Sequence, residues 1–177
     1  RRSYHIPKRL KVNHFEPFLF LSRVIRMKIL VDADACPKPI KEILFRAANR
    51  CKVECILVAN QILNHPQSPY IRSIRVDKGF DVADDYIVTL VNPKDLIITA
   101  DIPLADEAIK AGGIVLNPKG KKYTTSNIGQ VLAMRDFFTE MRDAGLVETK
   151  TKAFGAQQTQ AFSKELDTYL TAELKSN

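Results

Sequence analysis

Short runs of apolar residues alternate along the chain with segments whose apolar residues recur every three or four positions. Apolar runs without regular polar alternation are typical of strands buried on both faces, as in a parallel sheet. They predict strands at residues 29–31, 53–59, 96–100 and 114–116, with a weaker signal at 71–76. The periodic segments predict helices at about residues 40–47, 82–91, 103–111, 126–142 and 161–174. Strands that alternate with helices favour an α/β fold, a three-layer sandwich around a central, mostly parallel sheet.

Acidic residues follow two of the predicted strands. Asp32 comes directly after the first strand, with Asp34 two residues later, and Asp101 follows the strand at 96–100. The carboxyl ends of parallel strands meet at one edge of a sheet, where the sites of open α/β proteins form. We therefore expect Asp32 and Asp101 to lie at the same edge.

Two further acids, Asp84 and Asp85, lie at the start of the helix predicted at 82–91. We expect at least one of them to converge with Asp32 and Asp101 in one cleft. Carboxylates that are brought together repel one another, and a bound divalent cation removes that cost. Hard oxygen ligands suit Mg²⁺ or Mn²⁺.

The predicted site is therefore a carboxylate cluster that binds Mg²⁺ or Mn²⁺. Its predicted metal ligands are Asp32, Asp34, Asp84, Asp85 and Asp101. All of these except Asp34 are also predicted catalytic residues. A metal ion held in this way can activate water and stabilise the charge of a phosphodiester transition state.

Each of these aspartates also has an ordinary structural interpretation. Asp34 and Asp101 precede proline-containing helix starts and would suit helix N-caps. Asp84 and Asp85 would suit the first turn of a helix, where acids interact favourably with the helix dipole. Two acids at the ends of two strands of one sheet nevertheless favour a site over a pair of unrelated caps.

Polar residues at two other strand ends are candidates for substrate binding. Asn60 follows the strand at 53–59, and Asn117 and Lys119 follow the strand at 114–116. Lysine side chains in such a loop can bind phosphate groups beside the acidic site. The alternative is a solvated basic turn with no ligand.

Length, cysteine content and the length of the apolar runs indicate a single globular domain without a membrane-spanning helix. The chain has 177 residues, the length of one ordinary domain. Its three cysteines, Cys36, Cys51 and Cys55, do not resemble a disulfide framework or a zinc site, so we expect a reduced, cytoplasmic protein. No apolar run approaches the eighteen or so residues of a membrane-spanning helix, so we expect no membrane partner.

The positive charge is concentrated at the start of the chain. Seven basic residues and one acidic residue lie in 1–26, so this segment accounts for +6 of the net charge of +7. Overall charge is therefore weak support for nucleic-acid binding by the body of the protein. We interpret 1–26 as a leader outside the core, an extension of the gene start or residues added for expression, and 27–177 as the folded domain. A targeting peptide and a nucleic-acid-binding arm are the alternatives.

Four segments resemble the signature segments of one protein family. They are VDADACP at 31–37, ADDYI at 83–87, TADIPLA at 99–105 and LNPKG at 116–120. Together they resemble the YaiI/YqxD family of bacterial proteins, whose fold is similar to the PIN-like nuclease domains. The resemblance extends in order from Met27 to about Leu170.

PIN-like domains place acids at the end of the first strand, in a central helix and at the end of the fourth strand. The resemblance therefore implies the first place for Asp32, the second for Asp84 or Asp85, and the third for Asp101. Asp106, in the following helix, is a candidate for a further acid.

The leading hypothesis is a divalent-metal-dependent nuclease that acts on RNA. One alternative is a phosphatase similar to the haloacid dehalogenases, because Asp32 and Asp34 have the spacing of that family's nucleophile and acid. Cys36 stands where that family has Thr or Val, and a covalent aspartyl-phosphate would identify this chemistry.

The other alternative is a non-catalytic RNA- or protein-binding module with the same fold, which would lack a metal site. The sequence leaves the oligomeric state open.

The leader interpretation gives a first prediction. Deletion of residues 1–26 is expected to leave the thermal unfolding of the protein unchanged, because this segment has no periodic apolar face to pack against a core. Differential scanning calorimetry of the full and shortened chains measures this. A loss of several kcal/mol in the free energy of unfolding would contradict it.

Overall fold

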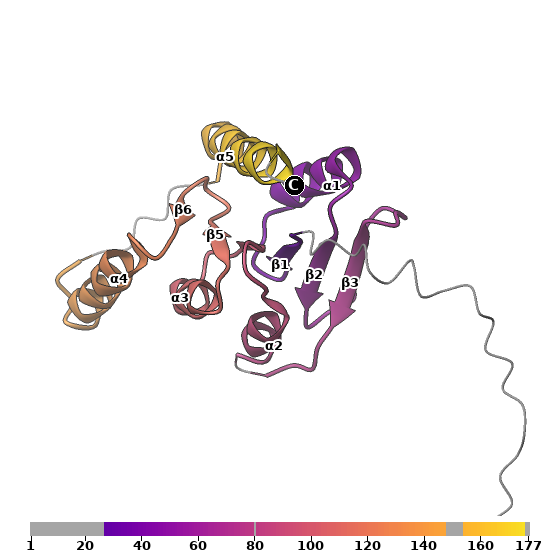
Figure 1. The fold of residues 1–177 in the computed structure, drawn as a ribbon. Coiled ribbons are helices and arrows are strands. Elements are labelled where there is room, and N and C mark those ends of the chain that lie inside the picture. The colour runs from indigo at the N-terminus through magenta and orange to yellow at the C-terminus, as the bar shows by residue number, and fades with distance from the viewer. Residues whose placement is uncertain (1–26, 80, 148–153, 176–177) are drawn as a thin grey trace, which may run out of the picture.

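A sheet of six strands lies at the centre of the computed structural model, and helices cover both of its faces (Figure 1). The structure describes residues 27–79, 81–147 and 154–175, so the interpretation of 1–26 lies outside the described residues. In chain order the elements are β1 (Ile29–Asp32), α1 (Lys38–Cys51), β2 (Cys55–Ala59), β3 (Ile71–Arg75), α2 (Val82–Leu90), β4 (Leu96–Ile98), α3 (Ile102–Lys110), β5 (Ile114–Leu116), β6 (Lys122–Tyr123), α4 (Ile128–Asp143) and α5 (Ala156–Lys175).

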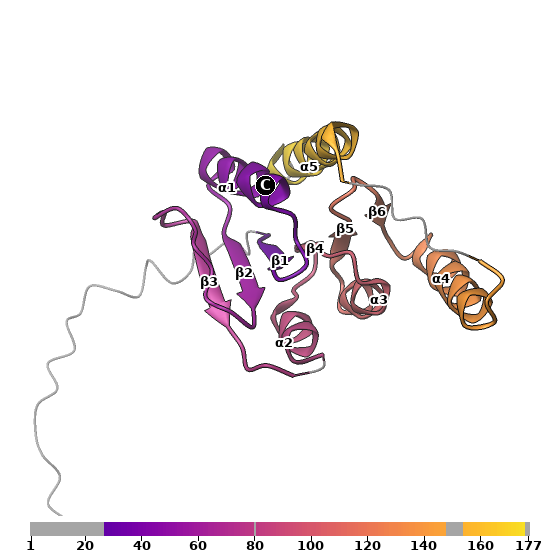
Figure 2. The same cartoon turned by 180° about the vertical axis from the view of Figure 1, so that it is seen from behind.

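The strand order is β3-β2-β1-β4-β5-β6. The first five of these strands are parallel, and β6 pairs with β5 in the antiparallel direction. Helices α1 and α5 lie on one face of the sheet, and α2 and α3 lie on the other (Figure 2). The structure therefore confirms the predicted α/β sandwich with a mostly parallel sheet, and it is consistent with a PIN-like fold.

The chain enters the sheet at its middle. It builds outward from β1 to β2 and β3, then returns to place β4 on the other side of β1. This reversal makes the gap between the carboxyl ends of β1 and β4 the topological switch point, where open α/β sheets form their sites. The first strand and the fourth strand are thus neighbours, although α1, β2, β3 and α2 separate them in the sequence.

Full burial explains why the strand sequences are apolar at consecutive positions. Ile29 and Val31 of β1 pack into the core beneath α1 and α5, and Leu30 between them packs into the core beneath α2 and α3. Phe162 of α5 is the largest completely buried side chain of the first core. Each apolar residue of β1 therefore stabilises one of the two helical layers against the sheet.

The loop between β2 and β3 agrees with the sequence-based expectation, whereas β6 differs from it. Strands β2 and β3 are parallel, but residues 60–70 connect them without a helix. The two-residue strand β6 was not predicted, because so short a strand within a lysine-rich turn has no apolar run. In β3, Ile71 is buried, whereas Arg72, Ser73 and Arg75 are exposed at the edge of the sheet.

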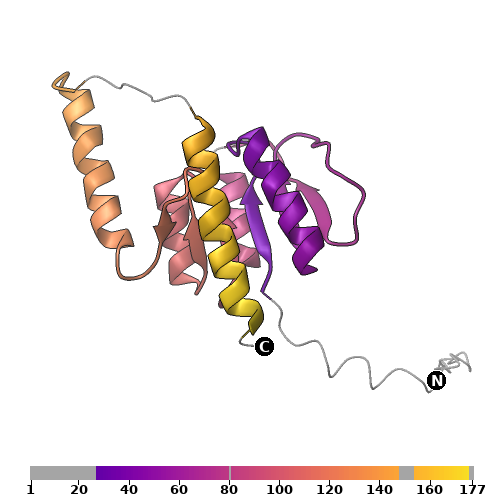
Figure 3. The same ribbon diagram turned by 90° about the horizontal axis from the view of Figure 1, so that it is seen from above.

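Helix α4 has few buried residues. Its first residue, Ile128, is its one fully buried side chain among the described residues, and Phe137 and Phe138 are exposed with their rings edge to face. Figure 3 shows α4 at the side of the molecule, away from α1 and α5. The carboxyl edge of β1 and β4 therefore remains independent of this helix.

The turn after β5 packs closely against α5, and it requires glycine. Gly120 has φ of +87°, and a Cβ placed there would lie 2.7 Å from the backbone of Ala161 and Phe162. Gly145, after α4, has a comparable φ of +71°, but a Cβ there would meet nothing within 4 Å. Both glycines therefore have a left-handed backbone conformation, but only Gly120 is closely packed against another element.

We predict that Gly120→Ala destabilises the protein more than Gly145→Ala. Both substitutions strain a left-handed residue at a cost of about 1–2 kcal/mol. Only Gly120→Ala adds a steric overlap with α5, which costs a further ~1–3 kcal/mol. Urea unfolding of the two variants measures the difference, and equal losses of stability would contradict the packing of this turn on α5.

Candidate functional site

Two acids flank the topological switch point. Asp32 is the last residue of β1, and Asp101 lies three residues beyond the end of β4. Asn60 follows β2 and Asn117 follows β5, so both also lie at the carboxyl edge. The structure thus places all four at the edge that the sequence predicted.

Thr99 connects the two acids. Val31 pairs with Ile98 across the two strands, so the next residues, Asp32 and Thr99, are neighbours. The buried Thr99 hydroxyl donates a hydrogen bond to Asp32 Oδ2 (3.0 Å) and accepts one from the backbone N–H of Asp101 (3.0 Å). One hydroxyl group therefore fixes the Asp32 carboxylate relative to the backbone that positions Asp101.

Sequence reasoning missed Thr99. The available signal was a hydroxyl residue between an apolar strand and an acid, but a single threonine at a strand end is too common to identify a site.

Asp101 is also the N-cap of α3. Its Oδ1 accepts a hydrogen bond from the backbone N–H of Leu104 (2.9 Å), which confirms the capping interpretation for this residue. Within the described residues this carboxylate accepts no other hydrogen bond, so Oδ2 is available to a ligand. Capping and ligand binding are therefore compatible at Asp101, because they use different oxygens.

Burial and charge both act on Asp32. Its side chain is only 8% exposed, and this burial is the largest cause of a raised pKa. The hydrogen bond from Thr99 lowers the pKa, and repulsion from Asp101 and Asp34 raises it again. The net effect is a raised pKa, caused first by burial and only then by repulsion from the neighbouring carboxylates.

Asp84 interacts with the same cluster, from α2. Burial, followed by repulsion from Asp32 and Asp101, raises its pKa to about 6. Asp85, its exposed neighbour in the first turn of α2, adds to the repulsion on Asp84. The position of α2 therefore favours Asp84 over Asp85 as the helical acid of the cluster.

Asp34 holds the loop that follows β2. Its Oδ2 accepts the backbone N–H of Asn60 (2.7 Å), and its Oδ1 accepts the side-chain amide of Gln61 (3.2 Å). The capping interpretation for Asp34 is wrong, because the N-cap of α1 is Pro37, without a side-chain cap bond. Asn60 binds Asp34 through its backbone.

The remaining candidates lie in the turn after β5 and on α3. Asn117 Oδ1 accepts the backbone N–H of Lys119 (2.8 Å), which shapes the turn after β5 and leaves the Lys119 side chain exposed. Asp106 forms an i,i+4 ion pair with Lys110 (2.5 Å) on the surface of α3. The described partner of Asp106 is thus Lys110, within its own helix.

A metal ion would have few protein ligands at this site. In the ranges 27–79, 81–147 and 154–175, no three His, Cys, Asp or Glu side chains form a group that could hold one ion. Mg²⁺ is commonly bound through one or two carboxylates while it keeps several waters. Asp32 and Asp101 supply the number of carboxylates that this mode of binding uses.

The cysteine beside the acidic segment is not activated. Burial raises the pKa of Cys36 to about 12, and the nearby charge of Lys41 only partly opposes this. The thiol is therefore protonated near neutral pH and is a poor nucleophile. The carboxylates remain the chemically competent groups of this edge.

Comparison with known proteins places the chain in a family. The profile of the family described as "Uncharacterized BCR, YaiI/YqxD family" matches residues 30–172. A UPF0178 protein of Shewanella sp. (strain ANA-3) is 56% identical over 143 residues, 81% of this chain and 95% of the relative. A UPF0178 protein of Shewanella pealeana is 54% identical over 149 residues, 84% of this chain and 99% of the relative.

The chain therefore belongs to the YaiI/YqxD family, as its four signature segments indicated. No solved structure matches it. Among the helices that the structure describes, none has both the length and the apolar composition to cross a lipid bilayer.

The raised pKa of Asp84 predicts a pH dependence of stability. Between the ordinary carboxyl pKa of 3.8 and about 6, the unfolded chain releases this proton while the folded protein keeps it. The free energy of unfolding should therefore fall as the pH rises through this interval. Asp84→Asn should make that fall smaller and should raise stability at pH 7, as measured by urea unfolding at several pH values in EDTA.

Asp77→Asn is the control, because it removes one exposed carboxylate from the loop before α2 and changes the net charge equally. It should leave the pH profile unchanged. If both variants shifted the profile alike, net charge rather than the cluster would be the cause.

Proposed function

We propose that the protein is a divalent-metal-dependent nuclease that acts on RNA. The observation that supports this most directly is the hydrogen-bonded unit of Asp32, Thr99 and Asp101 at the switch point. The raised pKa of Asp84 adds a third acid whose charge is unfavourable without a cation. Asp101 caps α3 and Asp84 lies in the first turn of α2, but neither structural role explains the buried Asp32 beside them.

Each acid has a distinct role in this proposal. Asp32 and Asp101 would hold Mg²⁺ or Mn²⁺, and Thr99 keeps the Asp32 carboxylate in one orientation. When bound, the ion lowers the pKa of a water molecule and stabilises the charge of the phosphodiester transition state. Asp84 orients the attacking water and accepts a hydrogen bond from it.

Basic and polar residues at the same edge favour a polyanionic substrate. Lys119 is exposed in the turn after β5, whereas Lys121 and Lys122 lie over the rings of Tyr123 and Tyr169. Lys119 is therefore the lysine of this turn best placed to bind a phosphate of the strand, and Asn117 holds the turn in shape.

Asp101→Asn tests the proposal through stability and activity together. Asparagine caps a helix as well as aspartate, so the metal-free variant should be as stable as the wild type or more stable. Mg²⁺ or Mn²⁺ at about a hundredfold above its dissociation constant should stabilise the wild type by ~2.7 kcal/mol and the variant by less. Cleavage of a labelled single-stranded RNA should fall at least about 100-fold.

Asp77→Asn again provides the control, and it should retain both the metal-induced shift and the cleavage. Equal metal-induced shifts in melting temperature for wild type and Asp101→Asn would exclude Asp101 as a ligand. RNA binding without metal and without cleavage would support the non-catalytic binding module in place of the nuclease.

A further inference from the structure

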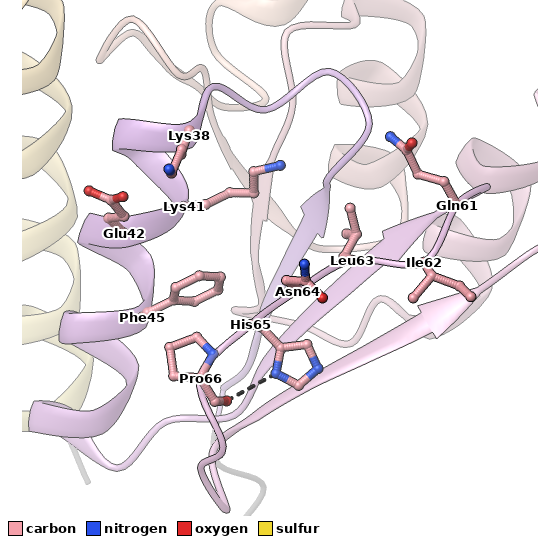
Figure 4. A pocket seen from close by; sticks show the side chains of 10 residues that line it. All are labelled: Lys38, Lys41, Glu42, Phe45, Gln61, Ile62, Leu63, Asn64, His65 and Pro66. Carbon is pink, nitrogen blue, oxygen red and sulfur yellow. Dashed lines mark hydrogen bonds between the residues drawn. The ribbon is translucent and has the colours of Figure 1, made fainter.

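A cavity of about 530 Å³ opens between α1 and the loop that follows β2 (Figure 4). Helix α1 contributes Lys38, Lys41, Glu42 and Phe45 to its wall, and residues 61–66 form the opposite side. The cavity exists because the parallel strands β2 and β3 are connected here by a loop, where a helix would have packed beside α1. Its volume lies within the range of small-molecule sites.

Two residues that line the cavity are hydrogen-bonded to the segment that follows Asp32. Gln61, which lines the cavity, donates a hydrogen bond to Asp34 (3.2 Å). Lys41, on the other side, donates one from Nζ to the carbonyl of Ala33 (3.2 Å). Ala33 and Asp34 directly follow Asp32, so a ligand in the cavity lies next to the proposed catalytic edge.

The charges of the cavity favour a phosphate group. Lys38 and Lys41 lie in the first turn of α1, and no side chain caps the N-terminus of that helix. The two ammonium groups attract an anion. The helix N-terminus adds little, because Pro39 has no N–H and the N–H groups of Ile40 and Lys41 bond to the carbonyl of Pro37. Glu42 adds one negative charge to the same wall and so weakens the attraction for an anion. Its carboxylate can accept hydrogen bonds from sugar hydroxyls.

The apolar part of the cavity favours an aromatic base. Phe45 is partly buried and packs against the core, so its ring is held in one place, and Ile62 opposite is 80% exposed. Aromatic rings held in this way stack on nucleobases. Figure 4 shows the Phe45 ring and the His65 side chain on opposite sides of the cavity.

His65 supplies hydrogen-bonding groups on the loop side. Its Nδ1 lies 3.0 Å from the carbonyl oxygen of Pro66, which requires a proton on Nδ1. In the neutral ring Nε2 is then an acceptor, suited to an amino group of a base. The neighbouring Asn64 amide both donates and accepts.

We propose that this cavity binds one nucleotide of a single-stranded RNA, with its phosphate at Lys38 and Lys41 and its base against Phe45. The identification of the ligand as part of an RNA strand rests on the proposed nuclease function. Binding of a single nucleotide depends only on the cavity. The nucleotide is the one adjacent to the phosphate that the carboxylate cluster acts on.

Binding of adenosine 5′-monophosphate to the full chain in EDTA tests the site directly, by calorimetric titration. Lys38→Ala and Phe45→Leu should each weaken the affinity about tenfold, and Phe45→Leu preserves apolar packing. Lys164→Ala on α5 and Phe137→Leu on α4 replace an exposed lysine and an exposed phenylalanine elsewhere, and they should bind as the wild type does. Thermal unfolding of each variant verifies that it is folded.

Asp101→Asn separates this inference from the proposed nuclease function. It should bind the nucleotide normally and lose cleavage, whereas Lys38→Ala and Phe45→Leu should raise KM and leave kcat unchanged. Nucleotide binding that is weakened by the cavity variants supports the site even if no RNA is cleaved. Absence of binding at millimolar nucleotide, equal binding by the cavity and control variants, or equally tight binding of inorganic phosphate would overturn it.

Discussion

The pairing of β1 with β4 is the contact on which the rest of this structure depends. Side chains join the two strands at both ends of the pair. At the amino ends, the buried Asp95 forms an ion pair with Lys28 and accepts the backbone N–H groups of Lys28 (2.9 Å) and Asn92 (2.7 Å). At the carboxyl ends, Thr99 donates to Asp32 (3.0 Å). These bonds fix the register that places the acids of the first and fourth strands side by side.

The two ends of this strand pair differ in their electrostatics. At the amino end the buried carboxylate of Asp95 is neutralised by a lysine and satisfied by two backbone donors, as a stable buried charge requires. At the carboxyl end no described lysine or arginine forms an ion pair with Asp32, Asp84 or Asp101, and burial and mutual repulsion raise the pKa of Asp32 and Asp84. Among the described residues of this strand pair, the unfavourable charge is thus concentrated at the carboxyl end.

The sequence predicted most of the fold because burial on both faces leaves a simple pattern. Consecutive apolar residues marked β1, β2, β4 and β5, and the parallel arrangement then placed Asp32 and Asp101 at one edge. Strand β6 was not predictable, because a two-residue edge strand contributes little burial. The connection from β2 to β3 was predicted as a loop, but its position beside α1 depends on tertiary packing.

The details of the site were less predictable, because they depend on how helices rotate against the sheet. Asp84 and Asp85 are adjacent and chemically identical, and only the position of α2 shows which one interacts with Asp32. Asp34 and Asp101 both suited helix caps, yet one caps α3 and the other binds a loop across the sheet edge. Sequence spacing fixes the residue types at an edge, and packing decides the direction of each carboxylate.

The outer edge of β3 has a consequence for the behaviour of the protein at high concentration. A strand at the edge of a sheet exposes unpaired backbone groups that can pair with another chain. Three of the five side chains of β3 are exposed, two of them arginines, and Arg72 forms an ion pair with Glu54 (2.7 Å). Pairing of this edge with a second sheet would remove these arginines from water, and the described ion pairs leave Arg75 without an acidic partner. The arginines of β3 therefore protect the sheet against edge-to-edge aggregation and growth into fibres.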